Sequence, residues 1–254
     1  MAVPSFDLTG KTALVTGARR GIGKAVAVAL ATYGADIVAV SSQMNADESE
    51  ISAEVKGLGR TFTPIKCDFS DQKQVLIIAD QLAEMHIDIL VNNAGITQRT
   101  PTLEHTDDMW DRVLQVNLTT PFVLTRSVGK QMIERGQGKV IFVGSLWSYQ
   151  GGLNVVSYTA SKHAIAGITK AISNEWAQFG VNVNAIAPGF VETEINSNMK
   201  HDLPDRYAFI NSRISSKRWG QPEDVAGAAV FLSAPASDYV HGTVLTVDGG
   251  WLAG

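Results

Sequence analysis

Short apolar runs alternate along this chain with longer stretches in which apolar positions recur every three or four residues. Runs such as Thr12–Thr16 and Lys139–Gly144 are typical of strands that are covered on both faces of a parallel sheet. Stretches such as Tyr158–Phe179 have the spacing of helices that bury one face. The pattern predicts strands at Thr12–Thr16, Ile37–Val40, Thr61–Lys66, Ile87–Val91, Lys139–Gly144, Val181–Ile186 and Val244–Val247.

The predicted helices fall between these strands. They are expected at Ile22–Tyr33, Ser49–Gly57, Gln72–Met85, Asp107–Asn117 with a continuation past Pro121 to Glu134, Tyr158–Phe179 and Glu223–Ser233. Strands that alternate with helices form right-handed βαβ units. The sequence therefore predicts one α/β domain over residues 1–254, a Rossmann-like, doubly wound parallel sheet of seven strands with helices on both faces. The exception is a charged, irregular stretch at about 190–218, which we interpret as a lid over a substrate.

Composition narrows the class of protein. The 254 residues are 45% hydrophobic and 18% charged with a net charge of −4, which argues against a basic surface for nucleic acid or an anionic membrane. We find no signal-peptide pattern and no apolar run long enough to span a membrane, so we expect a cytoplasmic protein. Cys67, the single cysteine, is expected to be a small buried filler. The histidines lack metal-ligand spacing, so no metal is predicted.

A glycine-rich turn follows the first predicted strand. Residues Thr16–Gly23 have the spacing TGxxxGxG, which would let the backbone approach a pyrophosphate at the start of the next helix. The general dinucleotide pattern is GxGxxG instead, and a turn with a purely structural role is the alternative. Two later loops fit a nucleotide: Asp68 and Phe69 follow the third strand, and Asn93, Ala94 and Gly95 follow the fourth.

The end of the second strand bears on the choice of cofactor. An NAD-binding protein usually has an acid there that bonds the adenosine ribose, but the first acid in this segment is Asp47. Arg19 and Arg20 add positive charge where a 2′-phosphate would lie, and Ser41 or Ser42 could hydrogen-bond it. These residues favour NADP over NAD. Solvated arginines in a turn are the alternative interpretation.

Four polar residues are candidates for catalysis. Tyr158 and Lys162 are four positions apart at the start of a predicted helix, so their side chains share a face. A lysine beside the phenol would make Tyr158 a general acid–base. Ser145 ends the fifth strand, where its hydroxyl could bind the substrate oxygen. Asn117, unfavourable in mid-helix, could hold a water that relays protons through Lys162.

Taken together, these motifs resemble the short-chain dehydrogenase/reductase family in its compact, single-domain form. The resemblance rests on TGxxxGxG, NNAG, Asn117, Ser145, YxxxK and NAIAPG, and covers about Phe6 to Gly254. It implies a catalytic tetrad of Asn117, Ser145, Tyr158 and Lys162, with the last two also touching the cofactor. It also implies a homotetramer.

The resemblance assigns the cofactor contacts in more detail. Gly17, Gly21, Ile22 and Gly23 would line the diphosphate, Asp68 the adenine and Asn93 the adenosine ribose. Pro188, Gly189 and Thr193 would hold the carboxamide side of the nicotinamide, with Val191 also lining the cofactor. The terminus of the second strand departs from the NAD pattern, which leaves NAD and NADP both open.

Further segments suggest the substrate. SYTASK, NEWA, RWG, ASDYV and VDGGWLA resemble enzymes of the gluconate 5-dehydrogenase and 2-deoxy-D-gluconate 3-dehydrogenase type, which implies a sugar acid, sugar or polyol. With Ser145 and Tyr158, we expect Trp147 and Gln150 to contact it. At least one of Arg99, Arg206 and Arg213 is expected to bind a substrate carboxylate; solvated surface charges are the alternative.

Two other functions remain open from the sequence. A 3-oxoacyl-acyl carrier protein reductase would share every tetrad motif, although it needs a basic docking face that a net charge of −4 does not favour. A non-catalytic NADPH-binding redox sensor would have no use for an intact tetrad of Asn117, Ser145, Tyr158 and Lys162. The sequence favours an oxidoreductase that acts on a secondary alcohol or ketone.

Overall fold

Seven parallel strands form one sheet in the part of the chain that the computed structural model describes, residues 5–44, 50–193 and 199–254. The strand order is β3-β2-β1-β4-β5-β6-β7, and every neighbouring pair is parallel. The order reverses between β1 and β4, so the chain winds outward in both directions from that pair. This confirms the predicted single-domain, doubly wound sheet.

The strands are β1 (Thr12–Thr16), β2 (Asp36–Ser41), β3 (Phe62–Lys66), β4 (Ile89–Asn92), β5 (Gly138–Val143), β6 (Val181–Pro188) and β7 (Val244–Val247). The helices are α1 (Gly21–Thr32), α2 (Glu50–Gly57), α3 (Gln72–Ala83), α4 (Asp107–Leu114), α5 (Thr120–Arg135), α6 (Val156–Trp176), α7 (Met199–Asp202), α8 (Pro204–Arg213) and α9 (Pro222–Ser233). The predicted elements are all present with slightly different ends, although Ser49 lies outside the described residues. No helix of the described chain is long and apolar enough to cross a membrane.

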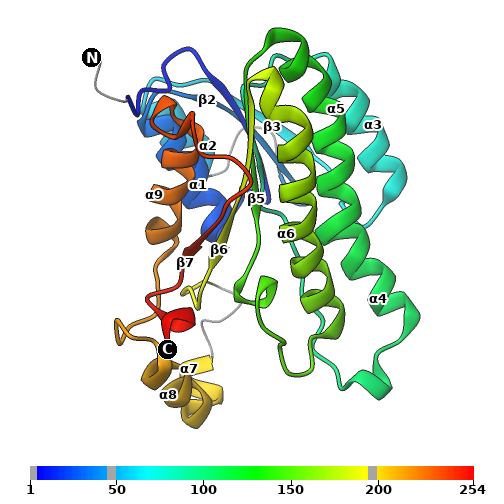
Figure 1. The fold of residues 1–254 in the computed structure, drawn as a ribbon, viewed down its shortest axis with the longest axis vertical. Helices are drawn as coiled ribbons and strands as arrows, with labels where there is room; N and C mark the ends of the chain where they lie inside the picture. The colour runs from blue at the N-terminus through cyan, green and yellow to red at the C-terminus, as the bar shows by residue number, and fades with distance from the viewer. Residues whose placement is uncertain (1–4, 45–49, 194–198) are drawn as a thin grey trace.

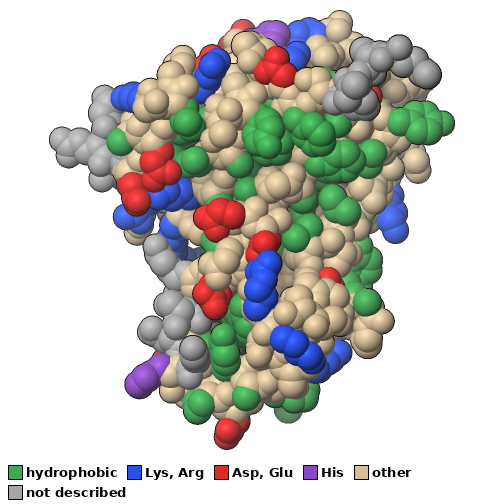
Figure 2. All heavy atoms as spheres, turned by 90° about the vertical axis from the view of Figure 1, so that its left-hand side faces the viewer, with side chains coloured by type: hydrophobic (Ala, Val, Ile, Leu, Met, Phe, Trp, Pro, Cys, Tyr) green, Lys and Arg blue, Asp and Glu red, His purple; other side chains and the backbone are tan. Residues whose placement is uncertain are grey.

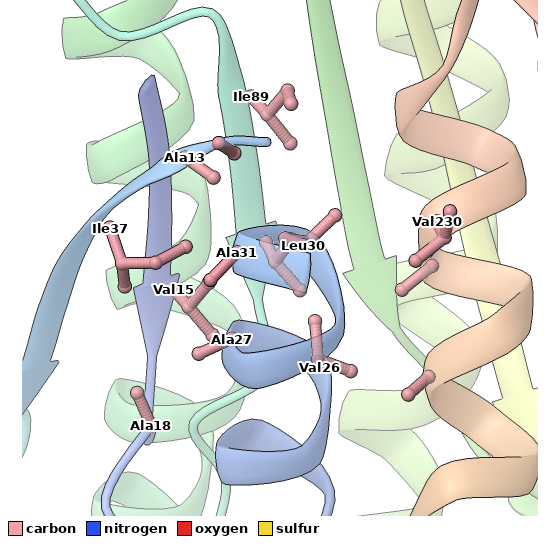
Figure 3. Close-up of a cluster of buried hydrophobic side chains, with 14 of the residues drawn as sticks. Ala13, Val15, Ala18, Val26, Ala27, Leu30, Ala31, Ile37, Ile89 and Val230 are labelled. Carbon is pink, nitrogen blue, oxygen red and sulfur yellow. The ribbon is translucent and has the colours of Figure 1, made fainter. Parts of the chain in front are cut away.

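Helices cover both faces of the sheet (Figure 1). α1, α2 and α9 lie on one face, and α3, α4, α5 and α6 lie on the other. Figure 3 shows one cluster of buried apolar side chains, to which Val15, Ile37 and Ile89 of the strands, Leu30 of α1 and Val230 of α9 belong. Each of these side chains is at most 3% exposed, and burying one stabilises the fold by roughly 1.5–3 kcal/mol.

The predicted helix 107–134 is interrupted. A π-helical segment, Gln115–Thr119, separates α4 from α5. Pro121 has no N–H and so cannot donate the α-helical bond to the carbonyl of Asn117. Pro121, across which one continuous helix was predicted, is therefore the physical reason for the interruption. π-helical segments are frequent at functional sites.

The described part of the predicted lid, 190–193 and 199–218, is more regular than expected, and 194–198 lie outside the described residues. It contains the two helices α7 and α8. Pro204 occupies the first turn of α8, a position where proline favours a helix. Tyr207, Ile210 and Ile214 follow at helical spacing and pack in one apolar cluster, so the segment has an amphipathic pattern among the charged and polar residues that flank these positions.

Cys67 directly follows β3 and is fully buried, which confirms the expected filler. Burial, together with the nearby carboxylates of Asp68 and Asp71, raises the pKa of its thiol to about 11. The thiol therefore stays protonated at neutral pH and is a poor nucleophile.

Candidate active site

A pocket of about 560 Å³ opens at the carboxyl ends of the strands. In open α/β sheets this edge, at the point where the strand order reverses, is where ligands bind. The pocket runs from the glycine turn after β1 to the residues that follow β5 and β6. A more open hollow of about 720 Å³ lies elsewhere, among Glu192, Tyr207, Asn211, Lys217, Arg218, Trp219, Gln221, Glu223 and Asp224. It contains none of the candidate catalytic residues.

Backbone conformation requires glycine in the turn after β1. Gly17 and Gly21 have φ angles of +66° and +54°, which other residues rarely adopt. A Cβ on Gly23 would lie 2.2 Å from the carbonyl oxygen of Gly17 and 2.4 Å from Nδ2 of Asn93. The first amides of α1 donate no hydrogen bond to the side chain of Arg20, which precedes the helix. The turn therefore offers bare backbone and a helix N-terminus to an anion, which fits a diphosphate.

The loop after β4 is tied to the same turn. The amides of Asn93 and Ala94 each donate to Oγ1 of Thr16 at 3.0 Å. Nδ2 of Asn93 donates to the carbonyl of Thr16 at 2.9 Å. These bonds fix the segment from Asn93 to Gly95 at the side of the pocket.

Positive charge and hydroxyl groups meet at the end of β2. The guanidinium of Arg19 donates to Oε1 of Gln43, so the turn after β1 and the segment after β2 are linked. Ser41 is buried and Ser42 is exposed, and both line the pocket. Gln43 is a lining residue that the sequence analysis missed, because its only signal was its place after the strand. Asp47 lies outside the described residues.

Tyr158 and Lys162 project from the first turns of α6 into the pocket. Nζ of Lys162 lies 5.5 Å from the ring centroid of Tyr158 and donates to the carbonyl of Val143 at 2.7 Å. Burial lowers the pKa of Lys162 to about 8. The ring of Tyr158 is partly exposed toward the pocket, but its hydroxyl is desolvated, and this burial raises its pKa more than a hydrogen bond with Ser145 lowers it.

Ser145 follows β5 and begins a short turn, Leu146–Ser148. Its side chain accepts from the backbone amide of Ser148, while its own amide donates to Oγ of Ser148 at 3.2 Å. Oγ of Ser148 in turn donates to the carbonyl of Lys162 at 2.8 Å. This capping box holds Ser145 beside the helix that carries Tyr158.

Asn117 is buried in the π segment beside the pocket, but it does not line it. Its Oδ1 accepts from the amide of Ile96 at 2.8 Å, and its Nδ2 donates to the carbonyl of Ile96 and to Oγ of Ser161. The side-chain amide therefore fixes the segment after β4. A water relay through Asn117 stays a prediction.

The candidate substrate residues separate in the structure. Trp147 and Arg99 line the pocket. Gln150 does not, and its Oε1 accepts a hydrogen bond from Nε1 of Trp251 at 3.1 Å. The pKa of Arg99 is lowered mainly by burial of its guanidinium and, to a smaller extent, by the positive charge of Arg206, which therefore lies nearby.

The pocket collects most of the residues that the sequence singled out. It is lined by Gly17, Arg19, Arg20, Gly21, Ile22, Gly23, Ser41, Ser42, Asp68, Phe69, Asn93, Ala94, Gly95, Ser145, Trp147, Tyr158, Lys162, Pro188, Gly189, Val191 and Thr193. Arg112 and Val155 also line it and carried no recognisable signal, because each depends on how its element packs.

A bare glycine turn and a Ser–Tyr–Lys group in one pocket are the arrangement of a nicotinamide-dependent oxidoreductase that acts on CH–OH groups. Residues 11–204 match the model of the family described as short chain dehydrogenase, and this chain belongs to that family.

Comparison with known proteins gives full-length matches. A relative from Pseudoalteromonas atlantica named 2-dehydro-3-deoxy-D-gluconate 5-dehydrogenase is 50% identical over 249 residues, which are 97% of this chain and 98% of the relative. A solved structure from Beutenbergia cavernae, named as a candidate NAD(P)-dependent gluconate 5-dehydrogenase with NADP bound at low occupancy, is 44% identical with a TM-score of 0.93 and covers 98% of this chain and 99% of its own. A gluconate 5-dehydrogenase from Burkholderia cenocepacia in complex with NADP and tartrate is 36% identical with a TM-score of 0.88, and the match covers 98% of each chain.

Proposed function

We propose that this protein transfers a hydride between NADP and a secondary alcohol or ketone of a sugar acid. The observation that carries the proposal is that Ser145, Tyr158 and Lys162 share a pocket with the glycine turn. A substrate beside Tyr158 would therefore lie next to a dinucleotide on the turn. When bound, the nicotinamide accepts or supplies the hydride, and the protein positions both partners and moves the proton.

The residues present fit such a cofactor. The space above Gly17, Ile22 and the first amides of α1 suits the diphosphate. Thr193 lies beside the same turn, since a Cβ on Gly21 would be 3.4 Å from its Cγ2. We propose that Pro188, Gly189, Val191 and Thr193 hold the nicotinamide end, and that Asp68 and Asn93 hold the adenosine.

Tyr158 is the proposed acid–base. In the oxidation of an alcohol, its deprotonated Oη takes the proton of the substrate hydroxyl as hydride leaves the carbon, and in reduction it returns that proton. Burial alone raises its pKa. The hydrogen bond with Ser145 opposes this effect, and the ammonium of Lys162, 5.5 Å from the ring centroid, would further stabilise the phenolate. Oγ of Ser145 would hold the substrate oxygen.

Proton exchange with solvent would pass Lys162 and Asn117. The side-chain amide of Asn117 is occupied by protein atoms. Its backbone carbonyl loses the α-helical donor at Pro121. We propose this carbonyl as the group that holds a relay water near Lys162.

The preference for NADP rests on the end of β2. Arg19 is held there by Gln43, beside Ser41 and Ser42. A guanidinium and two hydroxyls can bind a 2′-phosphate, whereas an acid would repel it. The NADP named in the two solved structures agrees with this preference.

An acidic substrate is supported by two arginines near the pocket. Arg99 lines the pocket, and its pKa is lowered first by burial and then by the positive charge of Arg206 on α8, which therefore lies nearby. A carboxylate that binds near two neighbouring positive charges offsets the repulsion between them. The relatives named for gluconates, and the tartrate in one of them, are consistent with such a ligand.

Initial rates with NADP⁺ and NAD⁺ over aldonic acids, deoxy-sugar acids, free sugars and polyols test the proposal. We expect turnover of an aldonic or deoxy-sugar acid. Arg99→Ala should raise KM for the acid about 10- to 100-fold, since a charge-assisted bond contributes about 1.5–3 kcal/mol. Arg126→Ala, an exposed arginine over Phe122 on α5, is the matched control. An unchanged KM in Arg99→Ala would remove it from the substrate site.

The relatives favour this function over the two alternatives. A 3-oxoacyl-acyl carrier protein reductase would turn over an acetoacetyl thioester in the reductive direction, and a redox sensor would bind NADPH without turning over any carbonyl. The acetoacetyl thioester and the NADPH-binding measurement belong in the same panel as the sugar acids, because each alternative function then has its own positive result.

A homotetramer, a cytoplasmic location and a lid at about 190–218 complete the proposal. Figure 2 shows one face of the molecule on which apolar side chains gather in a band above scattered charged residues, and such a face is suited to a second copy of the chain. For the lid, α8 packs through Ile210 in the cluster that includes Trp147. Light scattering tests the tetramer, and a mass near that of one chain would contradict it.

A further inference from the structure

Trp251, three residues from the last residue of the chain, connects three segments that surround the pocket. It is 4% exposed and does not itself line the pocket. Its Nε1 donates to Oε1 of Gln150 at 3.1 Å, which ties it to the turn after Ser145. The indole of Trp251 is therefore bonded to the segment that carries Ser145 and Trp147 at the pocket.

The faces of the indole make two more contacts. Phe190, which follows β6, lies 4.9 Å from Trp251 between ring centroids, and the guanidinium of Arg213 on α8 lies 4.1 Å above the indole. Phe190 in turn meets Trp147 edge-on at 6.5 Å. Phe190 and Trp147 line the pocket, and Trp251, which does not, packs against Phe190.

The turn that carries Trp251 is fixed by its own hydrogen bonds. Oδ1 and Oδ2 of Asp248 accept from the amides of Gly250 and Leu252, both at 2.8 Å. Oγ of Ser215, just after α8, donates to the carbonyl of Gly250 at 3.0 Å. Because the turn is held in this way, it can serve as a fixed support for the aromatic wall.

We propose that Trp251 and Gln150 are positioning residues that hold Trp147 against the substrate. The inference rests on the proposed function for the identity of that substrate. Ser145 is held separately by the capping box with Ser148, so loss of the Trp251–Gln150 bond moves the far end of the turn and leaves the acid–base group in place. The expected signature is a change in KM for the substrate with kcat retained.

Three variants of the full-length protein separate the contributions. Trp251→Phe keeps an aromatic ring beside Phe190 but removes the indole N–H, and Gln150→Leu removes the acceptor. Each should raise KM for the sugar acid roughly 3- to 10-fold, the effect of one hydrogen bond, with kcat and the Kd of NADPH within about twofold. Gln150→Glu keeps an acceptor and should stay closer to wild type. The double variant should equal the single ones, because both lose the same bond.

Trp219→Phe is the matched control. Trp219 is buried in the same aromatic cluster, 5.3 Å from Phe190, but its Nε1 has no hydrogen-bond partner among the described residues. Trp219→Phe therefore replaces a buried indole by a phenyl ring, as Trp251→Phe does, but removes no hydrogen bond of the indole N–H. We expect its KM to remain near that of wild type.

Hydrogen exchange supplies a readout that needs no turnover. The amides of Tyr149 and Gln150 both donate to the carbonyl of Leu146, and we expect them to exchange faster in Trp251→Phe than in wild type, with β5 unchanged. Unaltered exchange would overturn the proposal, even if the wild type turned over no sugar acid and the proposed function had failed. Faster exchange with an unchanged KM would also overturn it, as would a rise in KM for Gln150→Leu alone, which would make Gln150 a direct substrate contact.

Discussion

Lys162 is a buried amine in the proposed active site. It is 4% exposed, and its Nζ donates to the carbonyl of Val143. Burial lowers its pKa from 10.5 to about 8, so the folded protein holds an incompletely hydrated ammonium at neutral pH. Lys162→Met keeps the length of the side chain and removes that charge.

The sign of the effect follows from the pKa in the two states. Between about pH 8 and 10.5 the unfolded chain binds the proton of Lys162 and the folded chain does not, so wild-type stability rises with pH across this window. Below pH 8 the ammonium destabilises the fold by roughly 3 kcal/mol, and by pH 10 by about 1 kcal/mol or less. Beyond this pH-dependent part, the lost bond from the neutral amine to Val143 costs the variant about 0.5–1.5 kcal/mol.

The assay is urea unfolding of wild type and Lys162→Met, without cofactor and at one protein concentration, at pH 7 and pH 10. The stability of the variant relative to wild type should fall by about 2–3 kcal/mol from pH 7 to pH 10. Lys170→Met, an exposed lysine on the same helix, controls for the loss of a lysine. A variant-to-wild-type difference that is the same at both pH values would refute the argument that burial depresses this pKa.

Three further predictions concern activity and cofactor binding. Tyr158→Phe should lower kcat by about 10²- to 10⁴-fold while NADPH still binds, measured by nucleotide fluorescence; retention of most activity would place the acid–base elsewhere. Gly23→Ala should abolish NADPH binding in the same titration, because its Cβ would lie 2.2 Å from the carbonyl oxygen of Gly17, and tight binding in this variant would contradict the packing of the turn. Arg19→Ala should raise KM for NADP⁺ about 10- to 100-fold and leave KM for NAD⁺ nearly unchanged; an equal effect on both would mean that Arg19 does not contact the 2′-phosphate.

The sequence predicted those parts of the fold that depend on local pattern. Strands such as β1 and β5 are apolar on both faces because helices cover both sides of the sheet. Their continuous apolar runs therefore predict a buried strand from the sequence alone. α8 was missed because charged and polar residues flank its apolar positions on both sides, and only packing on the aromatic cluster shows that Tyr207 and Ile210 share a face. The π segment was missed because Pro121 is also compatible with the first turn of a new helix.

In the candidate active site too, local spacing was predictable and contacts between distant segments were not. Tyr158 and Lys162 could be paired from their spacing, since a helix fixes that relation. The bond between Gln150 and Trp251 joins residues 101 positions apart, and no periodicity encodes it. Gln43 likewise is linked at the pocket to Arg19, which is 24 positions away in the sequence. Local chemistry was therefore predictable, whereas contacts between distant loops required the tertiary structure.

Transfer of deuterium tests the central claim most directly. A keto-sugar acid that the enzyme reduces is incubated with NADPH deuterated at the transferring position, and the product is examined by NMR and mass spectrometry. The account predicts one deuterium on the new carbinol carbon, and none with Tyr158→Phe over the same time. Oxidation of the cofactor without deuterium in the product, or no reaction with any keto-sugar acid, would contradict it.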